Sequence, residues 1–596
     1  MCFGATCPTC SKKAWRGCGN HVQQVFDKVP ESQWCTCTPR TKIGGKEYPP
    51  AAAMQIPGLS WISSMLGGGS RQGSGRQTLG LHSTGKRPLD LMTPNRASSH
   101  DVQLPRLKDE GMEVHTPGQP ASLDWLFDFF FSQHKQNILA HAAVMLILSP
   151  SLISGAAALL LVAYIITRLS SATAKIPGPF VSNFTSLVLK WQELNANRTV
   201  YIHELHKRYG PVVRVAPNEV SFTSIAAVKE IYGSGGSGYD KTEFYNLFQV
   251  YGKRTMFSTL VKGDHAKRRR MIGDRYANSN VMKAAPLAGI KERSSKFLQH
   301  CVESPERTAD VFDEEMMHQV AADDSLQNRL VQYYSPVLHN LGSKVLASFA
   351  KPRSIPLADN FVIENAQQNG AASFTVLNRL KEKDSILDTM DMAAECLDHM
   401  AAGIDTTGDV LCFLMWELSQ PRSIKYQRLL REEFLRKADM PFDELPMLDA
   451  VLNEGLRCFP AIPMSLPRYV PQGGRVIDGF TLAEKTVVSC QAMSVHRIND
   501  GVFPEPDKFY PERWLAAEGD ADRRRHQWAF SSGGRGCVGK HLAMVEMKTL
   551  LRDVYSRYET EPDESMKSES MVMDDQLISS RPLGKRCLLK FVPVKD

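Results

Sequence analysis

A strong excess of charge of one sign is absent from this sequence. Its 596 residues carry a net charge of +7, which is modest for this length, and we expect no nucleic-acid partner. No apolar run follows Met1, so we expect no cleavable signal peptide. Cysteines are scarce beyond residue 40: seven are scattered from Cys301 to Cys587, without the pairing density of a disulfide scaffold. That scarcity fits a reducing environment for most of the chain.

Charge is missing altogether from residues 138–167, which contain no Asp, Glu, Lys or Arg. As one helix this run would be about 45 Å long, more than the roughly 30 Å hydrocarbon core of a bilayer requires. Because Ser149-Pro150-Ser151 falls in its middle, the run predicts either one tilted or kinked span or a re-entrant hairpin of two half-length helices. The half from Leu152 to Thr167 is the more apolar. A buried core helix is the alternative without a membrane.

Arg168 and Lys175 follow this run, so the positive-inside rule predicts that the downstream part of the chain is cytosolic. The prolines of Lys175–Pro179, KIPGP, restrict the backbone just after the run. We therefore expect a membrane anchor over residues 122–174 and a catalytic domain over residues 175–596.

The other six cysteines fall within residues 1–40, as Cys2, Cys7, Cys10, Cys18, Cys35 and Cys37. Thiolates in short clusters, with His21 close to Cys18, suit a tetrahedral zinc site, although the spacing is not that of a standard finger. Residues 1–40 are therefore either a small zinc module or a Cys-rich segment without metal, and they resemble small fungal Cys-rich proteins. Residues 41–121 are rich in Gly, Ser and Pro and predict a mostly disordered, flexible linker. Two explanations remain open for the connection of residues 1–121 to the rest of the chain. It is either a true gene fusion or the result of two neighbouring genes being merged into one predicted gene.

The most informative stretch is residues 530–539, FSSGGRGCVG. Cys537 lies in this glycine-rich loop, and a helical pattern follows from Lys540. A thiolate at a helix start is stabilised by backbone N–H groups and by the helix dipole, so the sulfur should stay ionised. An ionised sulfur of limited donor strength suits an axial ligand of haem iron. The alternative is a buried structural cysteine at a helix N-terminus.

A second pattern lies in a long helix predicted over Asp388–Ser419. Its centre, residues 401–407, reads AAGIDTT, and a threonine hydroxyl there can bond back to a carbonyl one turn earlier and open the helix locally. The opening admits a water, and the acid and alcohol of Asp405 and Thr406 can then carry protons inward. A tolerated glycine and a solvent-exposed aspartate are the alternative.

Charged pairs at helical spacing complete the set. His265 and Arg269 lie four apart on one helix face, as do Glu454 and Arg457 at a spacing of three. The first pair could donate to a carboxylate or belong to a solvated basic face, and the second could be an ordinary surface ion pair.

Residues 209–224 alternate apolar and polar residues across two short strands with a turn at Pro217-Asn218.

These motifs resemble those of the cytochrome P450 family: HxxxR, AGxDTT, ExxR, PERW and FxxGxRxCxG occur in the family's order over residues 175–594. The resemblance implies a mainly α fold with small β-sheets. It also implies haem b with Cys537 as iron ligand, Phe530 against the sulfur, Asp405 and Thr406 in proton delivery, and a structural cluster of Glu454 with two arginines, Arg457 and Arg513. The residues expected at the haem propionates are His265, Arg269, Arg468 and Arg535, with Arg268 and Arg270 pointing elsewhere.

The activity that the resemblance implies is a monooxygenase at the endoplasmic reticulum, supplied with electrons from NADPH by a reductase and acting on a small lipophilic substrate. The segments HAKRRR and FPAIPMSLPRYVPQGG resemble those of filamentous-fungal members of the family, many of which act in secondary metabolism. Desaturation or rearrangement is the alternative chemistry. Residues 271–385 look short, with loops expected at 350–361 and 366–373, so an inactive or truncated chain is another alternative. A zinc-binding interaction protein acting through residues 1–40 is the third.

Overall fold

The computed structural model describes residues 2–49 and 150–594, each range with short gaps, of which the longest are 313–325 and 348–355. The chain divides into two compact units, Met1–Ala121 and Ser122–Asp596. The predicted linker beyond residue 49 and the first half of the apolar run, up to residue 149, lie outside the described residues.

The first unit is built from short elements. They are β1 (Cys2–Thr6), β2 (Lys13–Gly17), α1 (Val22–Phe26), β3 (Thr41–Ile43) and β4 (Lys46–Tyr48). Both strand pairs, β1 with β2 and β3 with β4, are antiparallel. Regular structure thus continues to Tyr48, beyond the predicted boundary at residue 40.

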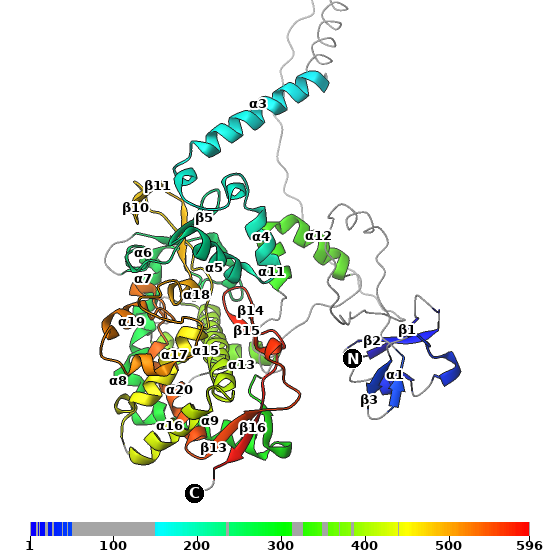
Figure 1. Ribbon diagram of the computed structural model, residues 1–596, viewed down its shortest axis with the longest axis vertical. Coiled ribbons are helices and arrows are strands. Elements are labelled where there is room, and N and C mark those ends of the chain that lie inside the picture. The colour runs from blue at the N-terminus through cyan, green and yellow to red at the C-terminus, as the bar shows by residue number, and fades with distance from the viewer. Residues whose placement is uncertain are drawn as a thin grey trace, which may run out of the picture. The chain divides into compact units, whose positions relative to one another are not determined.

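The second unit is mainly helical with small sheets, as predicted (Figure 1). Its N-terminal helices are α3 (Pro150–Leu169), α4 (Leu187–Leu194), α5 (Arg198–Tyr209), α6 (Ile225–Tyr232), α7 (Lys262–Ile272), α8 (Asn278–Val281) and α9 (Ala284–Glu303). Next come α11 (Leu326–Tyr334), α12 (Pro336–Ala347), α13 (Pro356–Gln367), α14 (Val376–Lys381), α15 (Thr389–Leu418), α16 (Ile424–Arg436) and α17 (Pro446–Cys458). The last are α18 (Ala492–Val495), α19 (Asp520–His526) and α20 (Lys540–Tyr555).

Helix α15 is the central element of this unit, and its 30 residues give it a length of about 45 Å. Its N-cap is Asp388, whose carboxylate accepts the backbone N–H of Asp391 at 2.7 Å, as the predicted start at this residue requires. The C-terminal third packs against α17 and α20 in the largest hydrophobic core (Figure 1). Gly455 of α17 lies so close to α15 that an added Cβ would come within 2.9 Å of Leu414. This rigid packing fixes the central AAGIDTT turn relative to the rest of the unit.

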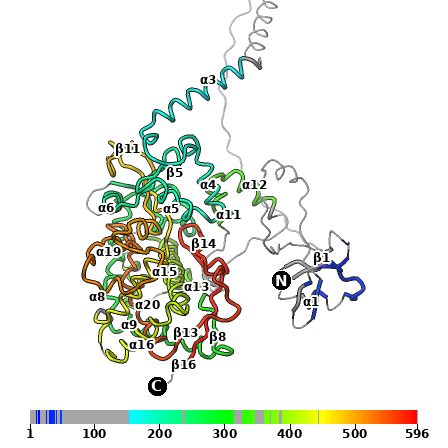
Figure 2. The backbone as a smooth tube through the Cα atoms, viewed as in Figure 1, coloured from blue at the N-terminus to red at the C-terminus, as the bar shows by residue number. Residues whose placement is uncertain are grey.

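The strands form sheets that join distant parts of the chain. They are β5 (Val212–Ala216), β6 (Glu219–Phe222), β7 (Asp240–Lys241), β8 (Thr308–Asp310), β9 (Arg468–Tyr469), β10 (Arg475–Ile477), β11 (Phe480–Leu482), β12 (Val487–Cys490), β13 (Tyr558–Pro562), β14 (Met573–Asp575), β15 (Ser580–Pro582) and β16 (Leu588–Pro593). The largest sheet has the order β5-β6-β12-β9-β7, and Figure 2 shows β5 and β11 at the same end of the unit. The predicted hairpin is confirmed as β5 and β6.

Helix α3 contains the apolar residues of the predicted anchor. Its window Leu152–Leu169 has a mean hydropathy of 2.0 and no residue buried, and by length and composition it is the one helix among the described residues that could cross a membrane. The chain then passes through KIPGP, where buried Arg214 of β5 donates to the carbonyls of Thr173, Ile176 and Pro179 at 3.1, 2.6 and 3.1 Å. A Cβ at Gly178 would lie 2.4 Å from the Arg214 carbonyl oxygen, so only glycine fits this close approach.

The loop predicted over residues 350–361 is partly wrong, because α13 begins at Pro356. Proline is favoured at the first helical position, where its missing N–H costs no hydrogen bond. Val362 and Ala366, four residues apart, then bury one face of α13 against Ala393 and Leu397 of α15. The region that looked short in the sequence therefore supplies a helix packed on α15.

Candidate active site

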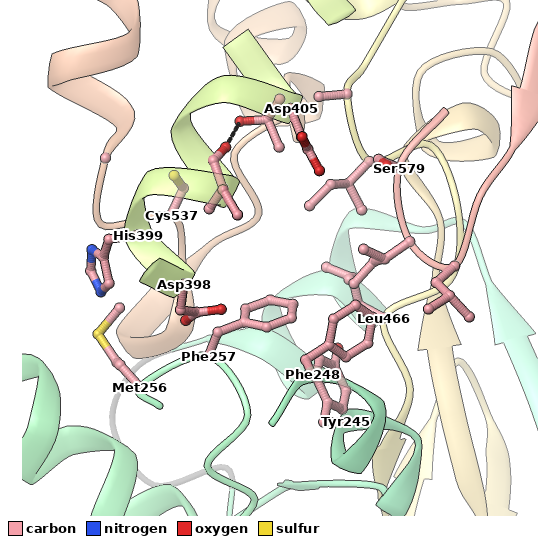
Figure 3. A pocket seen from close by; sticks show the side chains of 18 of the residues that line it. Tyr245, Phe248, Met256, Phe257, Asp398, His399, Asp405, Leu466, Cys537 and Ser579 are labelled. Carbon is pink, nitrogen blue, oxygen red and sulfur yellow. Dashed lines mark hydrogen bonds between the residues drawn. The ribbon is translucent and has the colours of Figure 1, made fainter. Parts of the chain in front are cut away.

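A cavity of about 1320 Å³ lies inside the second unit (Figure 3). It is lined by every residue that the sequence nominated for catalysis or haem binding. These residues are His265, Arg269, Asp405, Thr406, Arg468, Phe530, Arg535 and Cys537. They come from helices α7 and α15, strand β9 and the loop before α20, so the fold brings together positions more than 250 residues apart in sequence.

Hydrogen bonds hold the Cys537 loop against the cavity. The Cys537 N–H donates to the Phe530 carbonyl at 2.9 Å, and Arg269 Nη1 donates to the Gly536 carbonyl at 2.5 Å. Gly533 has a φ of 67°, a conformation that glycine adopts without strain. Arg269 is therefore engaged with the loop that carries the cysteine, which is a positioning contact that the sequence did not predict.

The pKa of the Cys537 thiol is subject to opposing influences. Burial raises the pKa of the thiol, and the backbone N–H groups of Gly539 and Lys540, together with Arg269, act in the opposite direction without outweighing it. The helix-start donors predicted from sequence are present, but they are too weak to keep the sulfur ionised by themselves. A coordinated metal cation deprotonates a thiol outright, so iron itself would supply the missing stabilisation.

Positive charge is concentrated along one edge of the cavity. Arg468 is buried, and its Nη1 donates to the Tyr245 hydroxyl at 2.8 Å. Arg535 Nη2 donates to the Leu260 carbonyl at 2.7 Å and approaches Asp240 at 3.5 Å. Burial, assisted by Lys241 and the nearby arginines, lowers the pKa of His265 to about 3, so that His265 is neutral at pH 7.

Lys241 belongs to the same edge and was missed from the sequence. It lies directly opposite Arg468 in the β7–β9 pair, although like charges facing each other across strands are destabilising. Its ammonium group donates to the Phe257 carbonyl and stands 4.3 Å from the centre of the Tyr245 ring. Burial, Arg468 and Arg535 all hold its pKa well below the usual range. The segment DKTEF around it has no motif that would mark a binding residue.

This edge fits an anionic cofactor. Within the described part of the chain, Nε and Nη1 of Arg535 are buried and have no hydrogen-bond partner. Buried donors of a guanidinium are rarely left unsatisfied, and burial together with Arg468 lowers the pKa of Arg535 to about 10. A ligand with carboxylates at this position would satisfy the donors and neutralise the repulsion. The two propionates of haem meet both requirements.

Arg268 points away from the cationic edge, as expected. The sequence assigned it away from the haem edge, and it does point away, but toward the interior rather than the surface. Its Nη1 lies 3.1 Å from Glu395 of α15, whose side chain is buried. Glu395 also accepts the backbone N–H of Met256 at 2.9 Å. Arg268 therefore ties α7 to α15, while Arg270 is exposed.

The acid and alcohol of α15 also line the cavity. Thr406 Oγ1 donates to the Ala402 carbonyl at 2.7 Å, which is the back-bonded geometry predicted for this turn. Asp405 Oδ2 lies 3.3 Å from Arg581 Nη2 of β15. Burial raises the pKa of Asp405, and Arg581 counteracts it. Arg581 was missed because it lies 176 residues away from Asp405 and outside every motif.

Apolar side chains line the rest of the cavity. In Figure 3 the rings of Phe248 and Phe257 gather with Leu466 on one side, and Asp398 points from α15 toward them. Burial raises the pKa of Asp398 to about 6. The cavity is therefore suited to a mostly apolar molecule that carries a hydrogen-bond donor or a cation near Asp398.

The ExxR and PERW motifs meet in one buried cluster. Glu454 Oε2 lies 2.9 Å from Arg457 Nε, and its Oε1 lies 3.1 Å from Arg513 Nε. Trp514 Nε1 donates to the same carboxylate at 2.8 Å. His496 connects this cluster to the cysteine loop, because its Nε2 accepts the Trp528 N–H at 2.9 Å and its Nδ1 contacts the Arg457 carbonyl at 3.1 Å. The cluster has no access to the cavity and is structural.

Enzymes that hold haem through a cysteine thiolate are the class with a site of this construction. A family model described as Cytochrome P450 matches residues 357–588. Cytochrome P450 monooxygenase orf2 of Aspergillus niger is 26% identical over 478 residues, which cover 73% of this chain and 96% of that protein. Two further relatives are Cytochrome P450 monooxygenase stcB of Emericella nidulans, 27% identical over 70% of this chain and 87% of its own, and hkm5 of Aspergillus hancockii, 29% identical over 65% and 84%. The chain is thus similar to fungal cytochrome P450 monooxygenases, and this similarity supports an enzyme of that class.

The first unit matches a different family model. Residues 1–45 match a domain of unknown function (DUF8730). The family comparison therefore assigns these residues apart from the catalytic unit, and it gives them no activity.

Proposed function

We propose that the second unit binds haem through Cys537 and oxygenates a small lipophilic molecule. The electrons come from NADPH through NADPH–cytochrome P450 reductase. One observation carries this proposal: a single cavity joins the Cys537 thiol to an edge of buried cations, with unsatisfied donors on Arg535. An apolar helix, α3, supports attachment to the membrane of the endoplasmic reticulum with the catalytic unit in the cytosol. The fungal relatives support a role in secondary metabolism.

Haem supplies the oxygen chemistry, with the thiolate favouring O–O cleavage. The residues of this chain have separate tasks around it. Lys241, Arg468 and Arg535 bind the propionates, while Arg269 holds the loop that presents Cys537. Phe530, half-buried at the start of that loop, lines the same cavity as Cys537.

Proton supply is the task of α15. Thr406 keeps its hydroxyl at the cavity wall by bonding to the Ala402 carbonyl, and Gly403 leaves the adjacent space open, because an added Cβ there would meet nothing within 4 Å. Asp405 holds a proton more readily than a solvent-exposed aspartate, because burial raises its pKa. Arg581 limits that rise and fixes the carboxylate. Together the pair can accept protons from water and pass them to the cavity.

The choice between oxygenation and the alternative chemistries is tested with oxygen-18 gas. The full chain, reconstituted with reductase and NADPH in lipid vesicles, is incubated with a library of lipophilic compounds. Mass spectrometry should find products that carry one labelled oxygen atom. Products without label would favour desaturation or rearrangement, and failure to take up haem would favour an inactive chain.

Replacing Thr406 with alanine should uncouple electron use from product formation. Without the hydroxyl, proton delivery slows, and acid–base assistance of this kind typically contributes about 10²–10⁴-fold. NADPH oxidation should continue while product per NADPH falls at least about ten-fold and hydrogen peroxide rises; Asp405→Asn should act in the same direction. Thr407→Ala changes the neighbouring alcohol and is the matched control. Equal coupling in the Thr406 and Thr407 variants would refute the assigned role.

Replacing Lys241 with methionine should have effects of opposite sign with and without haem. In the haem-free chain the change removes a buried cation that repels Arg468 and Arg535, so thermal stability should rise. In the haem-loaded chain it removes a charge-assisted hydrogen bond worth about 1.5–3 kcal/mol, so haem should dissociate about ten-fold faster or more. Transfer of haem to a scavenging globin and thermal melts measure the two effects.

The control for this change is Lys296→Met, at an exposed lysine whose partner is Glu292 at 2.7 Å. Both quantities should stay close to those of the parent chain there. A Lys241→Met chain that melts lower without haem, or keeps its haem as firmly as the parent, would contradict a role for Lys241 at the propionates.

A further inference from the structure

Three cysteine side chains converge in the first unit. The Sγ atoms of Cys10, Cys35 and Cys37 all lie within 4.8 Å of one another. Cys35 is fully buried, and Cys10 and Cys37 are half-buried. The Sγ atoms of Cys10 and Cys35 are 3.3 Å apart. This convergence joins the CxxC and CxC motifs of the sequence, whose cysteines lie 25 residues apart.

Backbone contacts hold the three thiols together. The Cys35 N–H donates to the Lys13 carbonyl at 2.7 Å, and Trp34 forms a parallel bridge with Lys13. The segment that carries Cys35 and Cys37 is thus fixed beside β2, just after the turn that contains Cys10. The Cys37 N–H lies 3.4 Å from Cys35 Sγ and can donate to it. Such an N–H···S contact stabilises a negatively charged sulfur.

The spacing of the sulfurs matches a tetrahedral metal site. With Zn–S bonds of about 2.3 Å, tetrahedral geometry places two sulfur ligands about 3.8 Å apart. The Cys10–Cys35 separation of 3.3 Å and the 4.8 Å limit within which all three sulfurs lie are compatible with this value, whereas a disulfide holds two sulfurs at about 2.05 Å. A disulfide between Cys10 and Cys35 would also not explain why the sulfur of Cys37 lies beside the other two.

The short length of the described part of this unit, residues 2–49, gives a second reason for a metal. Its buried aromatic core consists of Phe26, Trp34 and Tyr48, with Trp34 and Tyr48 stacked at 5.5 Å between ring centres. Chains of about 40 residues rarely bury enough apolar surface to fold unaided and commonly depend on a metal or on disulfides. A metal at the cysteine cluster would link β2 to the segment after Trp34, which the small core alone holds weakly.

We propose that Cys10, Cys35 and Cys37 bind a zinc ion that stabilises the first unit. Three soft thiolate donors select zinc over magnesium or calcium, and cysteine-rich ligand sets are typical of structural zinc sites. The proposal does not depend on the activity of the haem domain. A Cys10–Cys35 disulfide is the competing use of the same atoms, and an oxidising compartment would favour it.

Metal analysis of the full-length protein, purified without chelator in detergent, tests the proposal. Plasma mass spectrometry should find about one zinc per chain. X-ray absorption at the zinc edge should show at least three sulfur neighbours at about 2.3 Å, with a fourth donor completing the set. Cys35→Ser and the triple Cys10/Cys35/Cys37→Ser variant should lose the zinc, while the haem spectrum stays as in the parent.

Cys301→Ser, at a buried cysteine of the other unit, is the matched control and should keep its zinc. The proposal fails if the parent contains less than about a tenth of a zinc per chain. It also fails if the triple variant retains the ion, if the bound metal is iron, or if peptide mapping without reductant finds Cys10 bonded to Cys35. Haem content measured in the same samples separates these outcomes from a failure of the proposed oxygenase.

Discussion

A chain in which Cys537 is replaced by serine is expected to lose the absorption band that thiolate-ligated haem gives after reduction and binding of carbon monoxide. A serine hydroxyl keeps its proton at neutral pH and donates far less electron density to iron than a thiolate. The Gly539 and Lys540 N–H groups that face the sulfur would still be present, so the change removes the ligand while it leaves the loop. Product formation should fall more than about 100-fold, beyond what the loss of an outer-shell contact costs.

The control is Cys396→Ser, which makes the same chemical change at a half-buried cysteine of α15. Cys396 packs against Val362 and Leu397, and no lining residue of the cavity is replaced. Its spectrum and its activity should match those of the parent. Haem content, measured separately after extraction, distinguishes loss of the ligand from loss of the cofactor. If Cys537→Ser keeps the band while Cys396→Ser loses it, Cys537 is not the ligand.

The sequence was most reliable where one helix or one loop carries the chemistry. The α15 turn with Asp405 and Thr406, and the loop from Phe530 to Cys537, depend on residues close together in the chain, so their geometry follows from local spacing. The structure gives Thr406 the expected hydrogen bond to the Ala402 carbonyl. The helix predicted over Asp388–Ser419 is also local, and the structure gives it over Thr389–Leu418 with Asp388 as its N-cap.

Contacts between distant segments could not be derived in this way. Lys241 reaches the cationic edge only because a two-residue strand pairs β7 with β9, and Arg581 meets Asp405 only because β15 packs against α15. The pKa of Cys537 likewise depends on distant segments of the chain. Local N–H donors were visible in the sequence, but the burial that outweighs them is a property of the whole cavity.

The Glu454 cluster depends on contacts between distant segments. We expect Glu454→Ala to lower the stability of the fold more than any other substitution away from the cavity. The change leaves Arg457, which is fully buried, and Arg513, which is nearly so, without their carboxylate. It also removes the acceptor of the Tyr510 N–H at 2.8 Å and of Trp514 Nε1. Removing one partner of a buried ion pair typically costs about 3–5 kcal/mol, a large share of the stability of a typical domain.

The loss should reach the haem through His496. Its contacts with the Arg457 carbonyl and the Trp528 N–H connect the cluster to the start of the cysteine loop. A loosened cluster therefore releases the loop, and the chain should accumulate with little or no haem. Circular dichroism melts and haem content per chain measure the two consequences. Glu454→Gln keeps acceptors for Tyr510 and Trp514 but no charge, so its loss should be smaller than that of alanine.

Glu292→Ala supplies the comparison, because Glu292 forms an exposed pair with Lys296 and its removal should change stability by no more than about 0.5 kcal/mol. The ranking Glu454→Ala, then Glu454→Gln, then Glu292→Ala follows from burial and from the number of donors left unsatisfied. A Glu454→Ala chain that melts like the parent and carries a full complement of haem would mean that the two arginines find other partners. The cluster would then not be what holds the loop of Cys537 in place.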